Sequence, residues 1–136
     1  MEQYTIKCNK EQLMLIANAV EDWSRFLSGQ CEMWNATSLI DDTEDMHDCR
    51  KTLDRMVKPY VTPELGADAS YGWSGGGCPN DNQRKAIAMS YGVYRQIRHV
   101  MAIGRKGDTY CVYNSPTLTC EEQGPLIQIE KTETDE

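Results

Sequence analysis

The sequence predicts an α+β fold in which three helices pack on a small, mostly antiparallel sheet. Two observations favour this fold: long stretches carry apolar residues three and four positions apart, and three short stretches alternate or cluster apolar residues. Their order is strand, helix, helix, loop, helix, strand, strand, without the regular alternation of a doubly wound fold. We expect a single α+β domain over residues 1–130 and a frayed acidic tail over residues 131–136.

The first predicted elements are a strand and a long helix. Tyr4–Cys8 alternates in polarity, which is typical of a strand with one exposed face. Asn9 then begins a helix with a capping box completed by Gln12, and Gly29 suits the left-handed residue that ends it. The stretch Cys31–Ile40 fits neither element. The predicted buried stripe of this helix consists of Leu13, Ile16, Ala17, Val20, Trp23, Ser24 and Leu27.

A second helix is expected to begin at Asp41 or Asp42, because acidic residues in a first turn suit the helix dipole. Pro59 disfavours helical backbone at Lys58, so we expect the helix to end there. Its predicted apolar positions are Met46, Cys49, Leu53, Met56 and Val57.

A third helix follows the long loop Thr62–Pro79. It is expected to begin at Asn80 or Asn82, with Gln83 in a second capping box, and to end at Gly104. One face of this helix is predicted to hold Ile87, Tyr91, Tyr94, Arg98 and Met101.

Two further strands are expected over Thr109–Tyr113 and around Leu126, Ile127 and Ile129. A three-stranded sheet has open edges, so the sequence leaves a homodimer or a higher oligomer as an alternative to a monomer.

The charge of the chain is unevenly distributed. The net charge is −7, but residues 80–106 hold six basic residues against Asp81 alone, a local charge of +5 that leaves −12 for the remainder. An acidic protein is poorly suited to duplex nucleic acid, which requires many phosphate contacts from Lys and Arg. The basic segment is therefore the best candidate for binding a small anion.

No apolar run reaches the length of roughly 20 residues that a membrane helix requires, so we expect no membrane association. Met1–Lys7 lacks the apolar core of a signal peptide, which favours a cytoplasmic location. The six cysteines are then expected to be free thiols rather than three disulfides. His47 and Cys49 form the only close His/Cys pairing, so we expect no metal and no cofactor.

The leading candidate site lies where the glycine-rich loop meets the third helix. Consecutive glycines can direct several amides at one anion, and a helix start adds unpaired amides and a positive dipole. Basic side chains in the first turns could hold phosphate oxygens, and an aromatic side chain in the loop could stack on a base. The alternative is a plain connection with solvated basic residues, since neither a P-loop nor a dinucleotide fingerprint is present. The candidates are Tyr71, Trp73, Gly75, Gly76, Gly77, Asn80, Arg84 and Lys85.

Further candidates lie downstream. Arg98 falls on the predicted buried face, where it either pairs with a carboxylate or faces an anionic ligand, and Tyr91 and Arg95 are candidates beside it. Thr117 and Thr119 could present hydroxyls to the same ligand, although a turn with locally satisfied hydroxyls is the simpler explanation. No catalytic signature is present, which favours binding over catalysis.

Several runs resemble small accessory proteins of phages and mobile elements of gut bacteria: KCNKEQLMLIANAVEDW, the Tyr-Gly-Trp loop with Gly-Cys-Pro-Asn, QRKAIAMSYGVYR and SPTLTCEEQGPL. The resemblance supplies no functional residues. It implies a bacterial host cell and opposition to host defence. We therefore predict a non-enzymatic anti-defence protein that sequesters a phosphate-bearing nucleotide signalling metabolite. The alternatives are a protein-interaction module that blocks a host protein, or a small nucleotide hydrolase or transferase.

Overall fold

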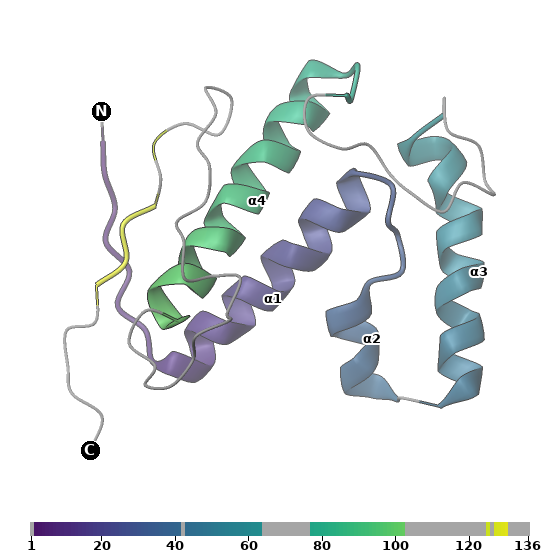
Figure 1. Cartoon of the computed structure of the whole chain (residues 1–136), viewed down its shortest axis with the longest axis horizontal. Coiled ribbons are helices and arrows are strands. Elements are labelled where there is room, and N and C mark those ends of the chain that lie inside the picture. Colours follow the sequence, from purple (N-terminus) through teal and green to yellow (C-terminus); the bar gives the residue numbers. More distant parts are fainter. Residues whose placement is uncertain (1, 42, 64–76, 103–124, 126, 131–136) are drawn as a thin grey trace.

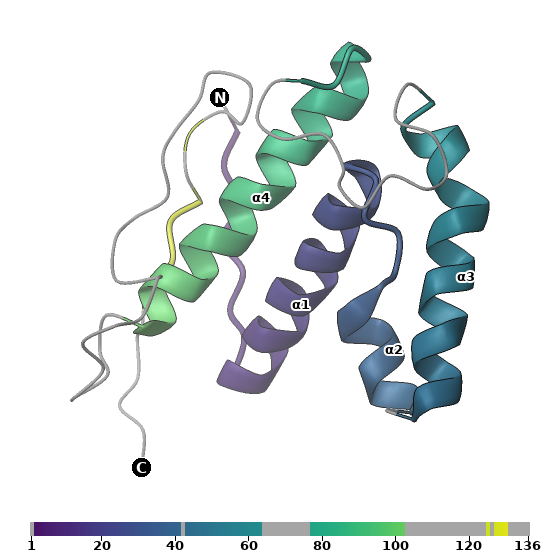
Figure 2. The same ribbon diagram turned by 45° about the vertical axis from the view of Figure 1, so that its right-hand side comes forward.

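The computed structural model describes residues 2–41, 43–63, 77–102, 125 and 127–130, and this part of the chain contains four α-helices and no β-strand. The helices follow one another across the molecule in the spatial order α4, α1, α2, α3 (Figures 1 and 2). The predicted α+β class is therefore wrong for the described residues, which form an all-helical arrangement. The helices are α1 (Lys10–Leu27), α2 (Trp34–Ile40), α3 (Glu44–Val61) and α4 (Asp81–Ala102).

The predicted strand over Tyr4–Cys8 is absent. Tyr4 and Ile6 are both strongly exposed, so the alternation of this segment does not mark a buried face. Residues 127–130 also form no strand, although Ile129 packs against the helical core. A strand requires a hydrogen-bonded partner, which local alternation cannot supply. The third predicted strand, Thr109–Tyr113, lies outside the described residues.

α1 begins and ends as predicted. The Asn9 side chain accepts a hydrogen bond from the Gln12 amide at 2.8 Å, and the Gln12 side chain accepts one from the Asn9 amide at 2.9 Å. At the other end, Gly29 has a φ of 98°, the left-handed conformation that favours glycine. The Gln30 amide donates to the Arg25 carbonyl at 2.8 Å, which completes a Schellman motif.

The pair α1 and α4 contains the apolar core. Ala17 of α1 and Tyr94 and Ile97 of α4 are buried together. Tyr91 was predicted for the same face, but it is exposed, because the buried face of α4 runs through Ser90, Tyr94 and Ile97 instead. The partly buried residues around this core are Leu13, Val20, Val93, Met101 and Ile129.

The start of α4 is fastened to two other helices. The Asn80 side chain accepts from the Gln83 amide at 2.9 Å, which confirms Asn80 as the helix cap. The Gln83 side-chain nitrogen then donates to the Leu27 carbonyl at 2.7 Å and to the Val61 carbonyl at 3.0 Å. One side chain thereby satisfies free carbonyls at the C-terminal ends of α1 and α3.

α2 occupies the stretch that the sequence left unassigned. Its cap residue, Met33, has left-handed backbone with a φ of 54°, an unfavourable conformation for a residue with a Cβ, and supplies no side-chain cap. Asp22 of α1 supplies the cap instead. Its two carboxylate oxygens accept from the amides of Asn35 at 3.0 Å and Ala36 at 2.8 Å. The N-terminus of α2 is thus stabilised by a neighbouring helix.

α3 differs from its prediction at both ends. Thr43, rather than Asp41 or Asp42, caps it by accepting from the Met46 amide at 3.3 Å. The helix continues through Pro59 to Val61. Pro59 removes one intrahelical amide donor, and the helix ends two residues after it.

Candidate functional site

The most unusual feature of the molecule is the orientation of α3, which turns two basic side chains inward. Arg50 and Lys58 are each only 2% exposed and are the largest fully buried side chains of the described residues. The Arg50 Nε donates to the Thr37 hydroxyl at 2.6 Å, and its guanidinium lies 4.1 Å from the centre of the Trp34 ring. Trp34 also meets His47 edge to face. α2 and α3 therefore meet through polar and aromatic contacts rather than through an apolar core.

Lys58 is held by a second polar cluster. Its Nζ lies 3.1 Å from an Asp54 carboxylate oxygen, and the other Asp54 oxygen accepts from the Cys31 amide at 2.8 Å. Burial raises the pKa of the Cys31 thiol to about 11, and the nearby Asp54 charge acts in the same direction. This cluster joins α3 to the turn after α1 and keeps the Cys31 thiol protonated at neutral pH.

A neighbouring side of α3 carries an apolar row that is largely exposed. Cys49, Leu53, Met56 and Tyr60, here called the outer row, follow at intervals of four, three and four residues and so lie along one side of the helix. Leu53 is half-buried and Cys49 is exposed, while Met56 is 67% and Tyr60 87% exposed. Of the five predicted apolar positions of this helix, Met46, Leu53 and Val57 are half-buried, but Cys49 and Met56 are exposed. The fully buried positions of α3 are taken by Arg50 and Lys58 instead.

A second exposed apolar pair lies at the end of α2. Leu39 is 83% and Ile40 75% exposed. The segment that joins this pair to the outer row is acidic and contains no Lys or Arg. Four acidic residues of this segment fall within the described residues, and all four are exposed. We call them the acidic corner: Asp41, Glu44, Asp45 and Asp48.

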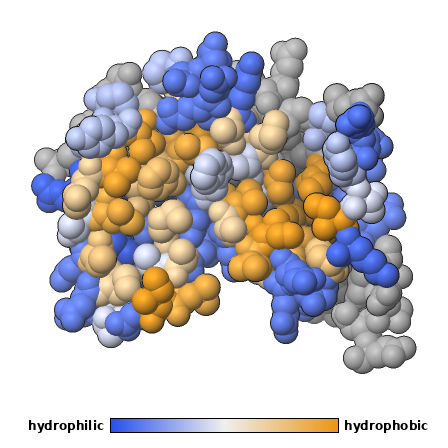
Figure 3. All heavy atoms as spheres, turned by 180° about the vertical axis from the view of Figure 1, so that it is seen from behind, coloured by the Kyte–Doolittle hydropathy of each residue, from blue (hydrophilic) through white to orange (hydrophobic). Residues whose placement is uncertain are grey.

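α1 also presents apolar side chains to solvent. Ile16 and Trp23 were predicted to be buried, but both are exposed because the narrower stripe through Ala17 and Ser24 makes the contact with α4. Met89 of α4 is exposed as well. From behind, hydrophobic residues gather in two areas, one on the side of α1 and α4 and one on the side of α2 and α3, with a hollow between them at the lower edge (Figure 3).

The predicted phosphate site has a different arrangement from the one expected. The Asn80 side chain is engaged in capping α4. Arg84 donates from Nη1 to the Cys78 carbonyl at 2.9 Å and pairs through Nη2 with the Asp81 carboxylate at 2.8 Å. An internal carboxylate therefore lies where the hypothesis needs phosphate oxygens. Gly77 and Lys85 are exposed, and Lys85 follows Arg84 by one position, so the two point to different sides of the helix.

Three other predicted residues lie along one side of α4 with Arg84, at intervals of seven, four and three residues: Tyr91, Arg95 and Arg98. Tyr91 is 52% exposed, and Arg95 and Arg98 are half-buried. The Arg98 Nη1 lies 3.4 Å from the Met14 sulfur of α1. The structure thus brings these residues to one face, although it does not bury them as a group.

The remaining predicted site residues lie outside the described residues, namely Tyr71, Trp73, Gly75, Gly76, Thr117 and Thr119. Their assignment to a ligand site therefore stays a prediction. The same holds for the predicted helix end at Gly104.

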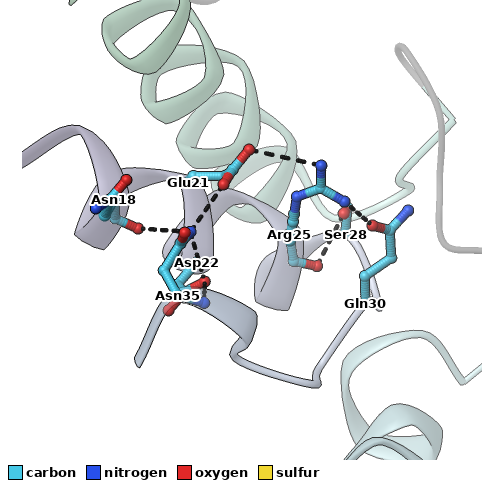
Figure 4. Close-up of polar contacts among 7 residues, drawn as sticks. All are labelled: Asn18, Glu21, Asp22, Arg25, Ser28, Gln30 and Asn35. Carbon is cyan, nitrogen blue, oxygen red and sulfur yellow. Dashed lines mark hydrogen bonds and ion pairs between the residues drawn. The ribbon is translucent and has the colours of Figure 1, made fainter. Parts of the chain in front are cut away.

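Asn35 of α2 organises a polar cluster on α1 (Figure 4). Its side-chain nitrogen lies within hydrogen-bonding distance of the Glu21 carboxylate at 2.7 Å, the Asp22 carboxylate at 3.0 Å and the Asn18 carbonyl at 3.2 Å. Partial burial acts to raise the pKa of Glu21, but hydrogen bonds from Asn35 and Tyr94, together with Arg25, outweigh it and lower the pKa below its ordinary value. Glu21 is therefore a structural carboxylate that favours the ionised form.

The described residues contain no group of three or more His, Cys, Asp or Glu side chains suited to holding a metal ion. Four cysteines fall within them as free thiols, with Cys8 and Cys49 exposed and Cys31 and Cys78 buried.

Sequence reasoning missed three of the apolar positions most exposed to solvent. Leu39 and Ile40 lie in the stretch that received no assignment, and Tyr60 lies beyond the predicted end of its helix at Lys58. One signal was present: two consecutive apolar residues run directly into an acidic segment that lacks basic residues. The residues that directly follow the pair are charged, so they offer no apolar side chains against which the pair could pack.

None of the helices in the described part of the chain combines the length and the apolar character needed to span a membrane. Compared with models of known protein families, with curated proteins and with solved structures, the chain has no significant match.

Proposed function

We propose that this protein is a non-enzymatic protein-interaction module whose binding surface is the outer row of α3 together with Leu39 and Ile40 of α2. The observation that carries the proposal is the orientation of α3, which buries Arg50 and Lys58 while Met56 and Tyr60 face solvent. Burying charge is costly, whereas burying an apolar row is favourable. α3 buries two charged side chains and leaves apolar side chains in water. A partner that covers the outer row would therefore add the favourable free energy of burying apolar surface.

The polar anchor of α3 makes this orientation stable without the partner. Arg50 stacks on Trp34, and Lys58 pairs with Asp54, so the inward charges have specific contacts. Because these contacts fix α3 in the isolated chain, the outer row is presented as a preformed surface. A preformed helical surface lowers the entropy cost of binding.

The test compares proteins captured from bacterial lysate by three forms of the chain. In the first variant Met56→Ser is combined with Tyr60→Ser, and in the matched control Tyr4→Ser removes an aromatic side chain of similar exposure outside the surface. We expect the wild type and the control to retain a protein that the double variant loses, and purified components to reproduce the difference by calorimetry. Equal retention by all three forms would contradict the proposal.

Sequestration of an anionic nucleotide-like metabolite is a second candidate function, favoured by the positions of Arg84, Tyr91, Arg95 and Arg98 on one side of α4. A phosphate at Arg84 would have to displace Asp81, which pairs with it at 2.8 Å. Thermal-shift screening against nucleotides and cyclic dinucleotides tests this function, because a ligand at 100 times its dissociation constant adds about 2.7 kcal/mol of stability. Arg98→Gln should abolish any shift, and a shift that survives both this variant and Arg84→Ala would exclude this face of α4 as the site.

A further inference from the structure

We infer that the partner of this surface is an amphipathic helical segment that carries Lys or Arg residues over the acidic corner. The inference rests on the proposed function and adds the chemistry of the partner. Its physical basis is the arrangement of two exposed apolar features on either side of a segment of one charge sign.

The apolar features require a partner with its own apolar stripe. The residues of the outer row recur at helical intervals over Cys49–Tyr60, so their length and spacing match the i, i+3, i+4, i+7 anchors by which an amphipathic helix binds. Leu39 and Ile40 extend the apolar surface past the start of α3.

The acidic corner determines the charge of that partner. Residues 41–48 carry five acidic side chains and no Lys or Arg, whereas the remainder of α3 carries four basic residues, Arg50, Lys51, Arg55 and Lys58, against Asp54 alone. Glu44 and Asp45 also suit the dipole of α3, but Asp41 and Asp48 lie outside its first turn and are exposed. Charges beside an apolar contact steer association and determine which charge sign of partner is favoured. The acidic corner therefore favours a partner segment that is positively charged at this position.

The acidic corner also disfavours a second copy of this chain as the occupant. Each copy has a net charge of −7 and carries the same acidic corner. Two copies whose acidic corners meet repel each other within the Debye length, which is about 8 Å at physiological salt. A cationic partner gains from the same field.

The experiment uses the full chain and two synthetic helical peptides that share one leucine stripe, one with Lys and the other with Glu on its polar face. Fluorescence anisotropy measures the affinity of each peptide. Three protein variants accompany the wild type. The row variant combines Met56→Ser and Tyr60→Ser; the corner variant combines Glu44→Gln, Asp45→Asn and Asp48→Asn; the control variant combines Glu2→Gln, Glu11→Gln and Glu130→Gln. The control removes the same charge from exposed positions elsewhere.

We expect the lysine peptide to bind and the glutamate peptide to bind much more weakly. The corner variant should weaken lysine-peptide binding on the order of tenfold at low salt. That difference should shrink at about 1 M salt, where the Debye length falls to about 3 Å. The control variant should retain most of the affinity, and the row variant should lose binding at both salt concentrations.

Three outcomes would overturn the inference. If the two peptides bind equally and the row variant loses both, the proposed surface is correct but its selectivity for a cationic partner is refuted. Equal weakening by the corner and control variants would show attraction to net charge alone. A dimer in light scattering that the row variant converts to monomer would assign the surface to a second copy. Peptide binding that is unaffected by the row variant would instead refute the proposed surface itself.

Discussion

Asp22 of α1 caps the N-terminus of α2 by accepting a hydrogen bond from the backbone amide of Asn35. Its carboxylate accepts from the backbone amides of Asn35 and Ala36, and the Asn35 side chain lies 3.0 Å from the same carboxylate. α2 has only seven residues, which is too short for stability in isolation. Its position, and with it the anchor of α3, therefore depends on one buried acid in a neighbouring helix.

Asp22→Ala should destabilise the protein by about 1–3 kcal/mol, because it leaves two backbone amides of α2 without their acceptor. Chemical denaturation monitored by circular dichroism measures the loss. Glu11→Ala, an exposed acid on the same helix, serves as the control and should change stability by less than about 0.5 kcal/mol. Equal effects of the two substitutions would show that the cap contributes nothing specific.

Asp54→Asn should destabilise the protein by about 3 kcal/mol, because it leaves the buried Lys58 ammonium without the carboxylate 3.1 Å away. The exposed Asp48→Asn change on the same helix should have little effect. The melting temperature and the free energy of unfolding in urea provide the measurement. A small effect of Asp54→Asn would mean that another group compensates the Lys58 charge.

Glu21 should make stability sensitive to acid. Its pKa in the folded protein lies below the ordinary value of 4.5, so the folded state binds this proton less readily than the unfolded state does. The resulting stabilisation is present above about pH 4.5 and is lost as the pH falls through the lower, folded pKa. Glu21→Gln should therefore reduce the free energy of unfolding at neutral pH and flatten its decline in acid. Parallel pH profiles of wild type and variant would contradict this role.

Cys31 should resist alkylation while Cys8 and Cys49 react readily. Burial and the raised pKa of about 11 keep the Cys31 thiol protonated and shielded, and only the thiolate is a good nucleophile. Iodoacetamide treatment at neutral pH followed by peptide mass spectrometry gives the rate at each site. Alkylation of Cys31 at the rate of Cys49 in the folded protein would show that the turn after α1 opens readily. Because Cys49 belongs to the outer row, its protection also reports whether a partner covers that row.

Local signals in the sequence were sufficient for the ends of α1 and the start of α4. Asn9, Gln12 and Gly29 act within a few residues of their own positions, and Asn80 caps α4 through the Gln83 amide three residues away. Such short-range hydrogen bonds are set by residue identity and spacing, so they can be predicted without knowledge of the fold. The predicted strands failed for the complementary reason, since a strand exists only through a partner that may lie anywhere in the chain.

The candidate site depended on contacts between helices. α3 has an apolar side and a charged side with the same helical period, and periodicity alone assigns the apolar side to the interior. The tertiary structure follows this assignment only in part, since Leu53 and Val57 are half-buried but Met56 is exposed. Two basic residues are buried instead, because Trp34 and Thr37 of α2 receive Arg50, and the Cys31 amide holds the Asp54 carboxylate that pairs with Lys58. The sequence by itself determined where helices begin and which residues share a face. Only the packing of α2 and the turn after α1 decided which face of α3 is covered, because the polar partners that offset two buried charges come from distant parts of the chain.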